Sequence, residues 1–411
     1  MTTSQPVRPA DGRARHGAAQ WPEEHTQRRL GSVLRLSGSL PASTWQRPAA
    51  GSPSITVLIP AHNEESALPA ALASLRWQTL QPSRVIVIAD NCTDSTVLVA
   101  RGEGADVLVT EGNTDKKAGA LNQALAMLLP TLDDDDLVLV MDADSMIVAH
   151  FLAVAAGRLL ADTDVGAVGG VFYGEPGGGF VGALQRNEYA RYAREIARKK
   201  GRAVVLTGTA SLFTALVLRA VAAGRGDRLP GRSGSVYDTL ALTEDNEITL
   251  AIKTLGWSPR SPRQCGVMTE IMPSWSALWK QRLRWQRGAV ENLRHYGFSR
   301  ITAPYIGKQL AMYLGIAAVS LFLAATGIFA VHGWLGIPEG VWWALPGLFI
   351  TERMWTVRRQ GSGAIALAAP IVFEFAYDLF QQAIYLRAAF DVVSGRTATW
   401  HHANDITPEG I

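Results

Sequence analysis

The stretch Leu137-Val138-Leu139-Val140-Met141-Asp142-Ala143-Asp144 decides the expected fold of this chain. A run of apolar, mostly branched residues predicts a strand buried on both faces of a sheet. Because side chains alternate along an extended chain, Asp142 and Asp144 lie on the same side at the strand's carboxyl end. An isolated Asp-x-Asp is also typical of a turn that caps the next helix, so the surrounding sequence has to decide between the two.

Working outward, short apolar runs alternate with segments of helical periodicity. The predicted strands are Ile55–Ile59, Val85–Ala89, Asp106–Thr110 and Leu137–Met141, and the predicted helices are Glu64–Trp77, Ser95–Arg101 and Lys117–Leu129. This alternation predicts an α/β fold with a parallel sheet covered on both faces. No Gly-x-Gly-x-x-Gly follows a strand and no P-loop motif occurs, which disfavours a nicotinamide dehydrogenase and a P-loop NTPase.

Polar side chains follow three of the predicted strands at the point where each strand ends. They are Ala61-His62-Asn63-Glu64, Asp90-Asn91 and Asp142-Ala143-Asp144. Each group alone is typical of a cap or a turn. Ligands of open α/β sheets bind at the carboxyl ends of the strands, so the joint placement favours one site. Two carboxylates there can hold Mg²⁺ or Mn²⁺ against a diphosphate.

Composition narrows the class of partner. The 39 Lys and Arg residues nearly balance the 36 Asp and Glu residues, so no nucleic-acid partner is expected. Cys92 and Cys265 match no zinc spacing, which is compatible with a reduced cytosolic environment. Residues 1–53 lack the apolar core of a secretory signal and are expected to form a mobile tail.

Three apolar runs occupy the last quarter of the chain. They are Leu310–Val331, Gly340–Thr351, and Ser362–Phe373 with its continuation to Val393. The first has 22 residues without a charge and is long enough as a helix to cross a bilayer. The other two are short or interrupted, and each could span, re-enter or lie at the interface. Basic residues between them, Arg353, Arg358 and Arg359, predict a cytoplasmic side by the positive-inside rule.

From Ile55 to about Tyr296 the chain resembles the membrane-associated family 2 glycosyltransferases, which include cellulose, hyaluronan and poly-N-acetylglucosamine synthases and ceramide glucosyltransferase. Six motifs in the family's order carry the resemblance: Ile59-Pro60-Ala61-His62-Asn63-Glu64-Glu65, Ala89-Asp90-Asn91-Cys92-Thr93-Asp94-Ser95-Thr96, Lys116-Lys117-Ala118-Gly119-Ala120-Leu121-Asn122, Asp142-Ala143-Asp144, Thr243-Glu244-Asp245 and Gln281-Arg282-Leu283-Arg284-Trp285. It implies a GT-A (Rossmann-like) fold, a nucleotide-sugar donor, Mg²⁺ or Mn²⁺, and inversion at the anomeric carbon. We expect residues 54–300 to form the catalytic domain, ending in an amphipathic interface helix, and residues 301–411 to form a membrane region of two to three hydrophobic helices.

The resemblance also assigns roles to individual residues. For the donor these are Ala61 and Glu64 at the nucleoside, Asp90 at the uracil edge, Lys117 near the diphosphate, and Asp142 and Asp144 at the metal and donor, with Asp144 the first choice as direct ligand. For the acceptor and diphosphate they are Gly208 and Thr209 in the acceptor-facing loop, Glu244, and Gln281, Arg284 and Trp285, which would close the site. Asp245 would be the catalytic base.

The chemistry of an inverting transfer needs such a base, because an acceptor hydroxyl does not ionise by itself at neutral pH. Asp245 begins a predicted helix that runs to Leu255, and the helix end would favour its ionised form. Simple capping of that helix by Thr243 and Asp245 is the structural alternative. The departing diphosphate needs positive charge, which Lys117, Arg284 and the metal would supply.

Three further segments carry expectations of their own. Trp275, Trp279 and Trp285, with Lys280, Arg282 and Arg287, predict a helix at a membrane interface. The arginines of the basic helix Phe180–Lys200 are expected to face solvent or headgroups. The segment Arg225–Ser235 is expected to be a mobile loop near the site and a candidate gate.

We therefore expect a multi-pass membrane enzyme, with its catalytic domain in the cytoplasm, that moves a hexose or N-acetylhexosamine from a UDP-sugar to a saccharide or lipid-linked acceptor. Processive polysaccharide synthesis is the leading version. A secretion channel of two or three helices would need membrane lipids around it and a second copy or an accessory membrane subunit. The alternatives are a single-transfer lipid or protein glycosyltransferase and a catalytically silent component of a synthase complex. A silent component should have lost an acid used only in chemistry, yet Asp142, Asp144 and Asp245 are all present.

Overall fold

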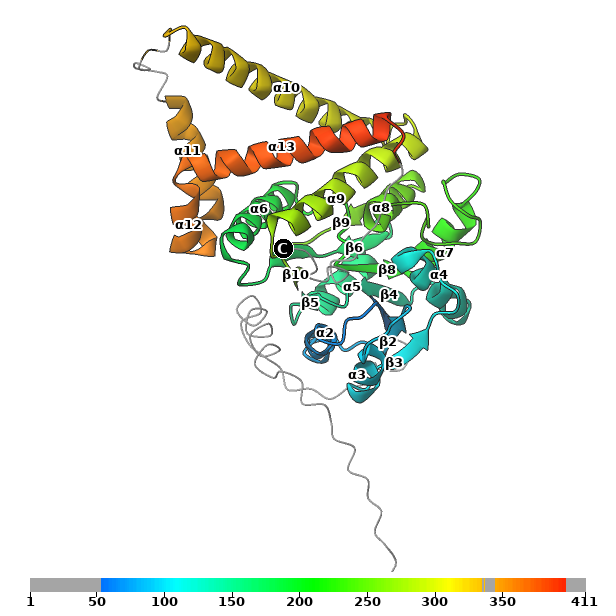
Figure 1. Cartoon of the computed structure of the whole chain (residues 1–411). Coiled ribbons are helices and arrows are strands. Elements are labelled where there is room, and N and C mark those ends of the chain that lie inside the picture. The colour runs from blue at the N-terminus through cyan, green and yellow to red at the C-terminus, as the bar shows by residue number, and fades with distance from the viewer. Residues whose placement is uncertain (1–52, 335, 337–343, 397–411) are drawn as a thin grey trace, which may run out of the picture.

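The computed structural model describes residues 53–334, 336 and 344–396 (Figure 1). The expected tail therefore lies almost wholly outside the described residues, as do residues 340–343 of the second apolar run. The main sheet has the strand order β3-β2-β1-β4-β8-β6-β9. Its strands are β1 (Ile55–Ala61), β2 (Arg84–Ala89), β3 (Asp106–Val109), β4 (Leu137–Met141), β6 (Ala167–Gly169), β8 (Ala210–Thr214) and β9 (Pro259–Arg260). A second, small sheet has the order β5-β10-β7, from β5 (Met146–Ile147), β7 (Val171–Gly174) and β10 (Gly266–Thr269).

The four strands predicted between residues 55 and 141 are present, and they pair in parallel as expected. The far half of the sheet differs, because β8 runs antiparallel to both β4 and β6. Gly208 and Thr209 of the expected acceptor-facing loop lead directly into β8, a strand that was not predicted. The antiparallel strand brings that loop back to the end of β4, where the Asp142 amide donates to the Thr209 carbonyl at 3.0 Å.

Helices cover both faces of the main sheet, as the alternation predicted. They are α2 (Leu68–Arg76), α3 (Thr96–Gly102), α4 (Lys116–Leu128), α5 (Phe151–Ala161), α7 (Ala215–Gly224) and α8 (Glu244–Thr254). Helix α6 (Gly179–Arg198) packs instead against β7 of the small sheet. Val57 and Ile59 of β1 pack with α2, α3 and α5 in one core. Leu58, their neighbour in β1, packs with α4, α7 and α8 in the other. Burial on both faces explains why these strands are apolar without interruption.

The described residues after the small sheet are mainly helical. The α-helices are α9 (Trp275–Tyr296), α10 (Ala303–Val331), α11 (Ala344–Val357), α12 (Ser362–Ala368) and α13 (Ile371–Val393). Among the described residues, α10 alone is long and apolar enough to cross a membrane, and a second span exists only if α12 and α13, bent by 75° at their junction, count as one. The 14 residues described for α11 are fewer than the about 20 that a bilayer core needs.

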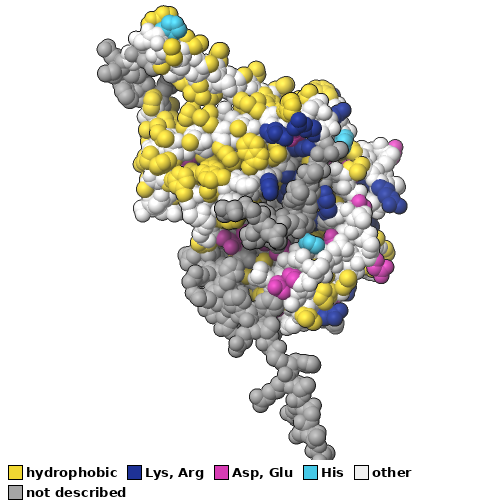
Figure 2. Space-filling view, in the orientation of Figure 1, with side chains coloured by type: hydrophobic (Ala, Val, Ile, Leu, Met, Phe, Trp, Pro, Cys, Tyr) yellow, Lys and Arg dark blue, Asp and Glu magenta, His cyan; other side chains and the backbone are white. Residues whose placement is uncertain are grey.

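Helix α13 lies alongside α9 rather than apart from the sheet domain (Figure 1). Trp275 and Trp279 of α9 pack edge-on against Phe380 of α13, with ring centroids 4.9 and 5.7 Å apart. Arg282, expected at the headgroup layer, is instead 4% exposed. The basic face of α9 is therefore partly an interface between helices of this chain. Hydrophobic side chains gather on the outer surface of α10 to α13 (Figure 2).

The basic helix α6 also differs from its expected surface role. Arg191 pairs with the fully buried Glu374 of α13, with Nη2 and Oε2 2.9 Å apart. Arg194 donates to the Trp355 carbonyl of α11 at 2.9 Å. These cations anchor the C-terminal helices to the sheet domain. The sequence pattern of these basic residues does not show whether they face water or a buried carboxylate.

Candidate active site

One cavity of about 550 Å³ opens beside the carboxyl ends of β1, β2 and β4. Every residue given a role in the sequence analysis lines it: Ala61, Glu64, Asp90, Lys117, Asp142, Asp144, Gly208, Thr209, Glu244, Asp245, Gln281, Arg284 and Trp285. These residues come from segments as far apart as positions 61 and 285. Asp142, Asp144 and Asp245 face a shared space, which is the arrangement that a common ligand requires.

The loops after β1 and β2 are held in left-handed backbone conformations at their tips. Asn63 has φ 55° and Asn91 has φ 50°, a region that asparagine tolerates better than most residues. Asp90 Oδ1 accepts from Thr110 Oγ1 and from Asn113 Nδ2, both at 2.8 Å. These contacts orient the carboxylate toward the cavity.

Glycine at position 119 makes the Asp90 arrangement sterically feasible. A Cβ there would lie 2.1 Å from Asn113 Oδ1 and 2.7 Å from Asp115 Cβ. Glycine at position 119 therefore allows α4 to approach the Asn113 side chain closely. A side chain at this position would displace Asn113, and with it one of the donors that orient Asp90.

Lys117 at the start of α4 bridges two acids from different parts of the chain. Its Nζ lies 2.6 Å from Asp142 Oδ1 and 2.7 Å from Glu244 Oε1. Burial lowers the pKa of Lys117, but Asp142 and then Glu244 outweigh this and raise it well above the ordinary value. The amine is therefore charged at neutral pH. It neutralises part of the acidic cluster and offers positive charge inside the cavity.

Asp245 lies across the cavity, at the start of α8. Its Oδ2 accepts from the Gly208 amide at 3.1 Å, and its Oδ1 accepts from the Asn246 amide at 2.8 Å. Burial and then the charge of Glu244 raise the pKa of Asp245 to about 6. The position of Asp245 at a helix start predicted that it would be ionised, but burial beside a second acid dominates its pKa. A carboxylate with a pKa near 6 is well matched to accept a proton at neutral pH.

The alternative that Thr243 and Asp245 simply cap α8 does not account for these contacts. Thr243 occupies the N-cap position, yet its side chain makes no capping hydrogen bond. The Asp245 carboxylate is oriented partly by Gly208, which lies 37 residues earlier in the chain. The Asp245 carboxylate at the start of α8 is therefore positioned by another part of the cavity wall.

Asp142 and Asp144 are the residues that could hold a divalent cation. Among the described residues no group of three or more His, Cys, Asp or Glu side chains has metal-binding geometry. Two carboxylates still suit Mg²⁺ or Mn²⁺, because such ions take their other ligands from water and substrate phosphates. One oxygen of Asp142 already contacts Lys117. Burial raises the pKa of Asp142 to about 6, with Asp144 adding to the effect, so a cation would relieve a repulsion between them.

The Gln-x-x-Arg-Trp segment forms the opposite wall, from helix α9. The buried Gln281 Oε1 has no hydrogen-bond partner among the described residues. Trp285 is held by the Arg282 guanidinium, which lies 4.3 Å from its ring centre. Arg282 Nη2 in turn lies 2.9 Å from Glu188 Oε2 of α6. The second residue of the segment therefore has a structural role that the sequence analysis missed.

Further residues line the cavity without having been predicted. The aromatic residues among them come from β7, α6 and α13 and are Phe172, Tyr189, Tyr192 and Tyr385, with Glu188 beside them. Phe172 stacks on Tyr192 and meets Tyr189 edge-on, at centroid distances of 5.0 and 4.7 Å. The regular spacing of aromatic residues in α6 is the only sequence signal that could have indicated this wall. Nothing in the sequence indicated that α13 would reach it.

A solved structure with a similar fold is the mannosyltransferase PcManGT from Pyrobaculum calidifontis, in complex with GDP-Man and Mn²⁺. It is 19% identical, with a TM-score of 0.52 over 91% of this chain and 97% of that chain. The fold is thus that of the GT-A glycosyltransferases, as the sequence predicted.

The family model described as "Glycosyltransferase like family 2" matches residues 53–288, more than half of the chain. The protein belongs to this family of transferase enzymes. It is 23% identical over 268 residues to the poly-beta-1,6-N-acetyl-D-glucosamine synthase of Staphylococcus aureus (strain COL), covering 64% of this chain and 61% of that one. It is 26% identical over 271 residues to the probable glycosyltransferase YdaM of Bacillus subtilis (strain 168), covering 59% of this chain and 57% of that one. The match thus spans less than two thirds of either relative.

Proposed function

We propose that this protein is an inverting, metal-dependent glycosyltransferase that moves a hexose or N-acetylhexosamine from a UDP-sugar to a saccharide or lipid-linked acceptor at a membrane. The observation that carries the proposal is the single cavity shared by Asp142, Asp144 and Asp245. The sugar-polymer synthase among its relatives supports a sugar acceptor. The mannosyltransferase with bound Mn²⁺ supports a divalent ion, either Mn²⁺ or Mg²⁺.

The donor would occupy the half of the cavity formed by the loops after β1, β2 and β4. Ala61 and Glu64 would flank the nucleoside, and the Asp90 carboxylate would accept a hydrogen bond from the uracil edge. Asp142 and Asp144 would hold the cation, which would stabilise the charge on the departing diphosphate. Lys117 and Arg284 would add positive charge on the same oxygens, and such stabilisation is usually the largest catalytic contribution.

The transfer step would use Asp245 as the general base. An acceptor hydroxyl attacks the anomeric carbon, the bond from that carbon to the diphosphate oxygen breaks, and the hydroxyl proton passes to the Asp245 carboxylate. Gly208 and Asn246 amides hold the carboxylate in place during the step. Glu244 stays ionised through its contact with Lys117, so it adds negative charge that favours proton uptake by Asp245.

The acceptor would occupy the aromatic half of the cavity. Flat rings such as Trp285, Tyr192 and Tyr385 offer apolar surface to the C–H faces of a sugar ring. Gln281 Oε1 is an acceptor without a partner in this wall, and a sugar hydroxyl could supply one. Gly208 and Thr209 complete the floor beside Asp245. This half of the site suits a saccharide better than a small polar acceptor.

Membrane attachment would come mainly from α10, whose apolar surface is largely exposed along its length. Lys308 near the start of α10 and Lys199 at the end of α6 both contact Glu195, and basic residues at this end of the helix would favour a cytoplasmic sheet domain by the positive-inside rule. A multi-pass arrangement requires the bent pair α12–α13 or the run from Gly340 to Val357 to cross as well. A processive enzyme would need a second copy or an accessory membrane subunit to complete a channel.

The test incubates purified membranes with a panel of UDP-sugars and Mg²⁺ or Mn²⁺, and measures UDP release and product size. We expect UDP release with one sugar, dependence on the ion, and either a polymer or a single-sugar product. The polymer would support the processive version and the single-sugar product the lipid or protein glycosyltransferase. Absence of UDP release with every sugar, from protein shown to be folded, would favour a catalytically silent component instead.

A further inference from the structure

The face of α9 that carries the Gln-x-x-Arg-Trp segment continues beyond the cavity. Gly288, Asn292 and Tyr296 follow Trp285 at intervals of three, four and four residues, so they lie on the same side of the helix. The first turn of α8 contains Glu244 and Asp245. All three α9 residues contact either this turn or Thr243, the residue before it. We call this set the α9 stripe. Its role in catalysis, argued below, rests on the proposed function.

Gly288 lets the two helices approach at the N-cap of α8. A Cβ at position 288 would lie 2.5 Å from Thr243 Oγ1, 2.8 Å from its Cγ2 and 3.1 Å from its Cβ. Real Cβ atoms do not come so close to three atoms of a buried residue. Any side chain at position 288 would therefore push Thr243, and with it the neighbouring Glu244, away from α9.

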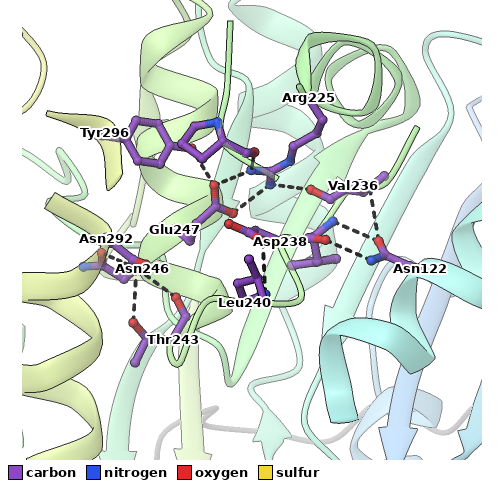
Figure 3. Close-up of polar contacts among 12 residues, drawn as sticks. Asn122, Arg225, Val236, Asp238, Leu240, Thr243, Asn246, Glu247, Asn292 and Tyr296 are labelled. Atoms are coloured by element: carbon purple, nitrogen blue, oxygen red, sulfur yellow. Dashed lines mark hydrogen bonds and ion pairs between the residues drawn. The ribbon is translucent and has the colours of Figure 1, made fainter. Parts of the chain in front are cut away.

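Asn292 forms hydrogen bonds at the start of α8, where the Thr243 side chain forms no capping hydrogen bond. Its buried Nδ2 lies 3.3 Å from both the Thr243 carbonyl and Thr243 Oγ1, and 3.0 Å from Asn246 Oδ1. Two N–H groups are thus shared among three oxygens on either side of Glu244 and Asp245 (Figure 3). The start of α8 is held by a neighbouring helix rather than by its own cap.

Tyr296 ends the stripe at a buried ion pair. Its hydroxyl donates to Glu247 Oε1, which also contacts Arg225. The Arg225 side chain is fully buried and donates to the carbonyls of Pro230 and Val236 at 2.8 and 2.6 Å (Figure 3). Arg225 is the first residue of the segment Arg225–Ser235, which was expected to be a mobile loop and a candidate gate. The buried contacts of the Arg225 side chain hold this end of the segment in place. Gly288, Asn292 and Tyr296, spaced about one turn apart, therefore join α9 to the start of α8.

We propose that Gly288 and Asn292 are positioning residues, which set where Asp245 lies relative to the Gln-x-x-Arg-Trp side chains on the same helix. An α-helix is stiff and rises 1.5 Å per residue, so a contact at Asn292 fixes α9 about 12 Å from Arg284 along its axis. Asp245 and the Gln-x-x-Arg-Trp side chains opposite it then keep a fixed position relative to each other. Displacing reacting groups by about 1 Å can reduce a rate about 100-fold, so this registration governs turnover.

The experiment compares Asn292→Ala and Gly288→Ala with His295→Ala, an exposed position on the same helix. The full-length protein is assayed with the UDP-sugar that the wild type turns over, and UDP binding with Mn²⁺ is measured by calorimetry. We expect kcat to fall about 10- to 100-fold in both stripe variants, while the Kd for UDP stays within about twofold because the nucleoside loops are remote. The double variant should lose little more than either single one, since both act on Thr243.

Two outcomes would overturn the inference. One is a kcat within about twofold of wild type in both variants. The other is a parallel loss of kcat, UDP binding and melting temperature, which would make the stripe a folding element only. Wild-type protein that turns over no UDP-sugar would instead contradict the proposed function itself, so the two failures are distinguishable.

Discussion

Replacing Asp245 by Asn should slow transfer strongly and at the same time make the protein more stable. The two effects share one cause, which is the burial of a carboxylate beside Glu244 and the resulting pKa of about 6. Asparagine has nearly the same shape and can accept the Asn246 hydrogen bond, while its NH₂ group replaces the oxygen that accepts from Gly208. It carries no charge and cannot take up a proton from an acceptor hydroxyl.

The magnitudes follow from that pKa. A positioned general base contributes about 10²- to 10⁴-fold to a rate, so kcat should fall by that factor. The folded protein binds a proton at Asp245 up to pH about 6, whereas an unfolded chain loses it near pH 4. Stability therefore falls as pH rises from about 4 through 6. Two pH units correspond to at most about 3 kcal/mol, and we expect about 1 kcal/mol because solvent reaches part of the site.

The assay measures kcat, the Kd for UDP and the melting temperature of wild type and Asp245→Asn from pH 4 to 8. We expect wild-type kcat to rise with pH through about 6, UDP binding to survive the substitution, and the variant to melt about 2–4 °C higher at pH 7.5. That gain should shrink toward pH 4, where wild-type Asp245 is protonated. Near wild-type turnover in the variant would refute Asp245 as the base. A melting-temperature difference that does not depend on pH would refute the electrostatic reasoning.

Other parts of the structure make further predictions. Arg284→Lys should lower kcat about tenfold or more, measured as UDP release, because a lysine cannot hold two phosphate oxygens at once; an unchanged rate would mean that Arg284 supplies only charge. Chelation with EDTA should stop turnover and added Mn²⁺ or Mg²⁺ should restore it, with Asp144→Asn requiring a higher concentration of the ion; turnover in EDTA would exclude the metal assignment. Glu247→Gln should lower the free energy of unfolding by about 3–5 kcal/mol in denaturant titrations, because it leaves the buried Arg225 charge unpaired. The exposed pair Arg84–Asp106 provides the control, since Arg84→Ala should cost less than about 1 kcal/mol.

Much of the catalytic half of this protein follows from local sequence patterns. Two-sided burial makes β1 and β4 apolar without interruption, and the chain direction of parallel strands then brings Asp90, Asp142 and their neighbours to one edge. These are properties of single strands and of the way parallel strands join. The same holds for α10, whose length and lack of charge are visible in the sequence alone.

Contacts between distant elements were settled only by the tertiary structure. Arg191 and Arg282 were expected to face solvent or headgroups and Arg225 to begin a mobile loop, yet each is paired with a carboxylate from another element. The ionisation of Asp245 also depends on the tertiary structure. Its position at a helix start predicted an ionised acid, but burial beside Glu244 raises its pKa. Periodicity shows which face of a helix is apolar, but it does not show which element covers the polar face. A charge is stable in water or beside a buried partner, and only the folded chain determines which of the two surrounds it.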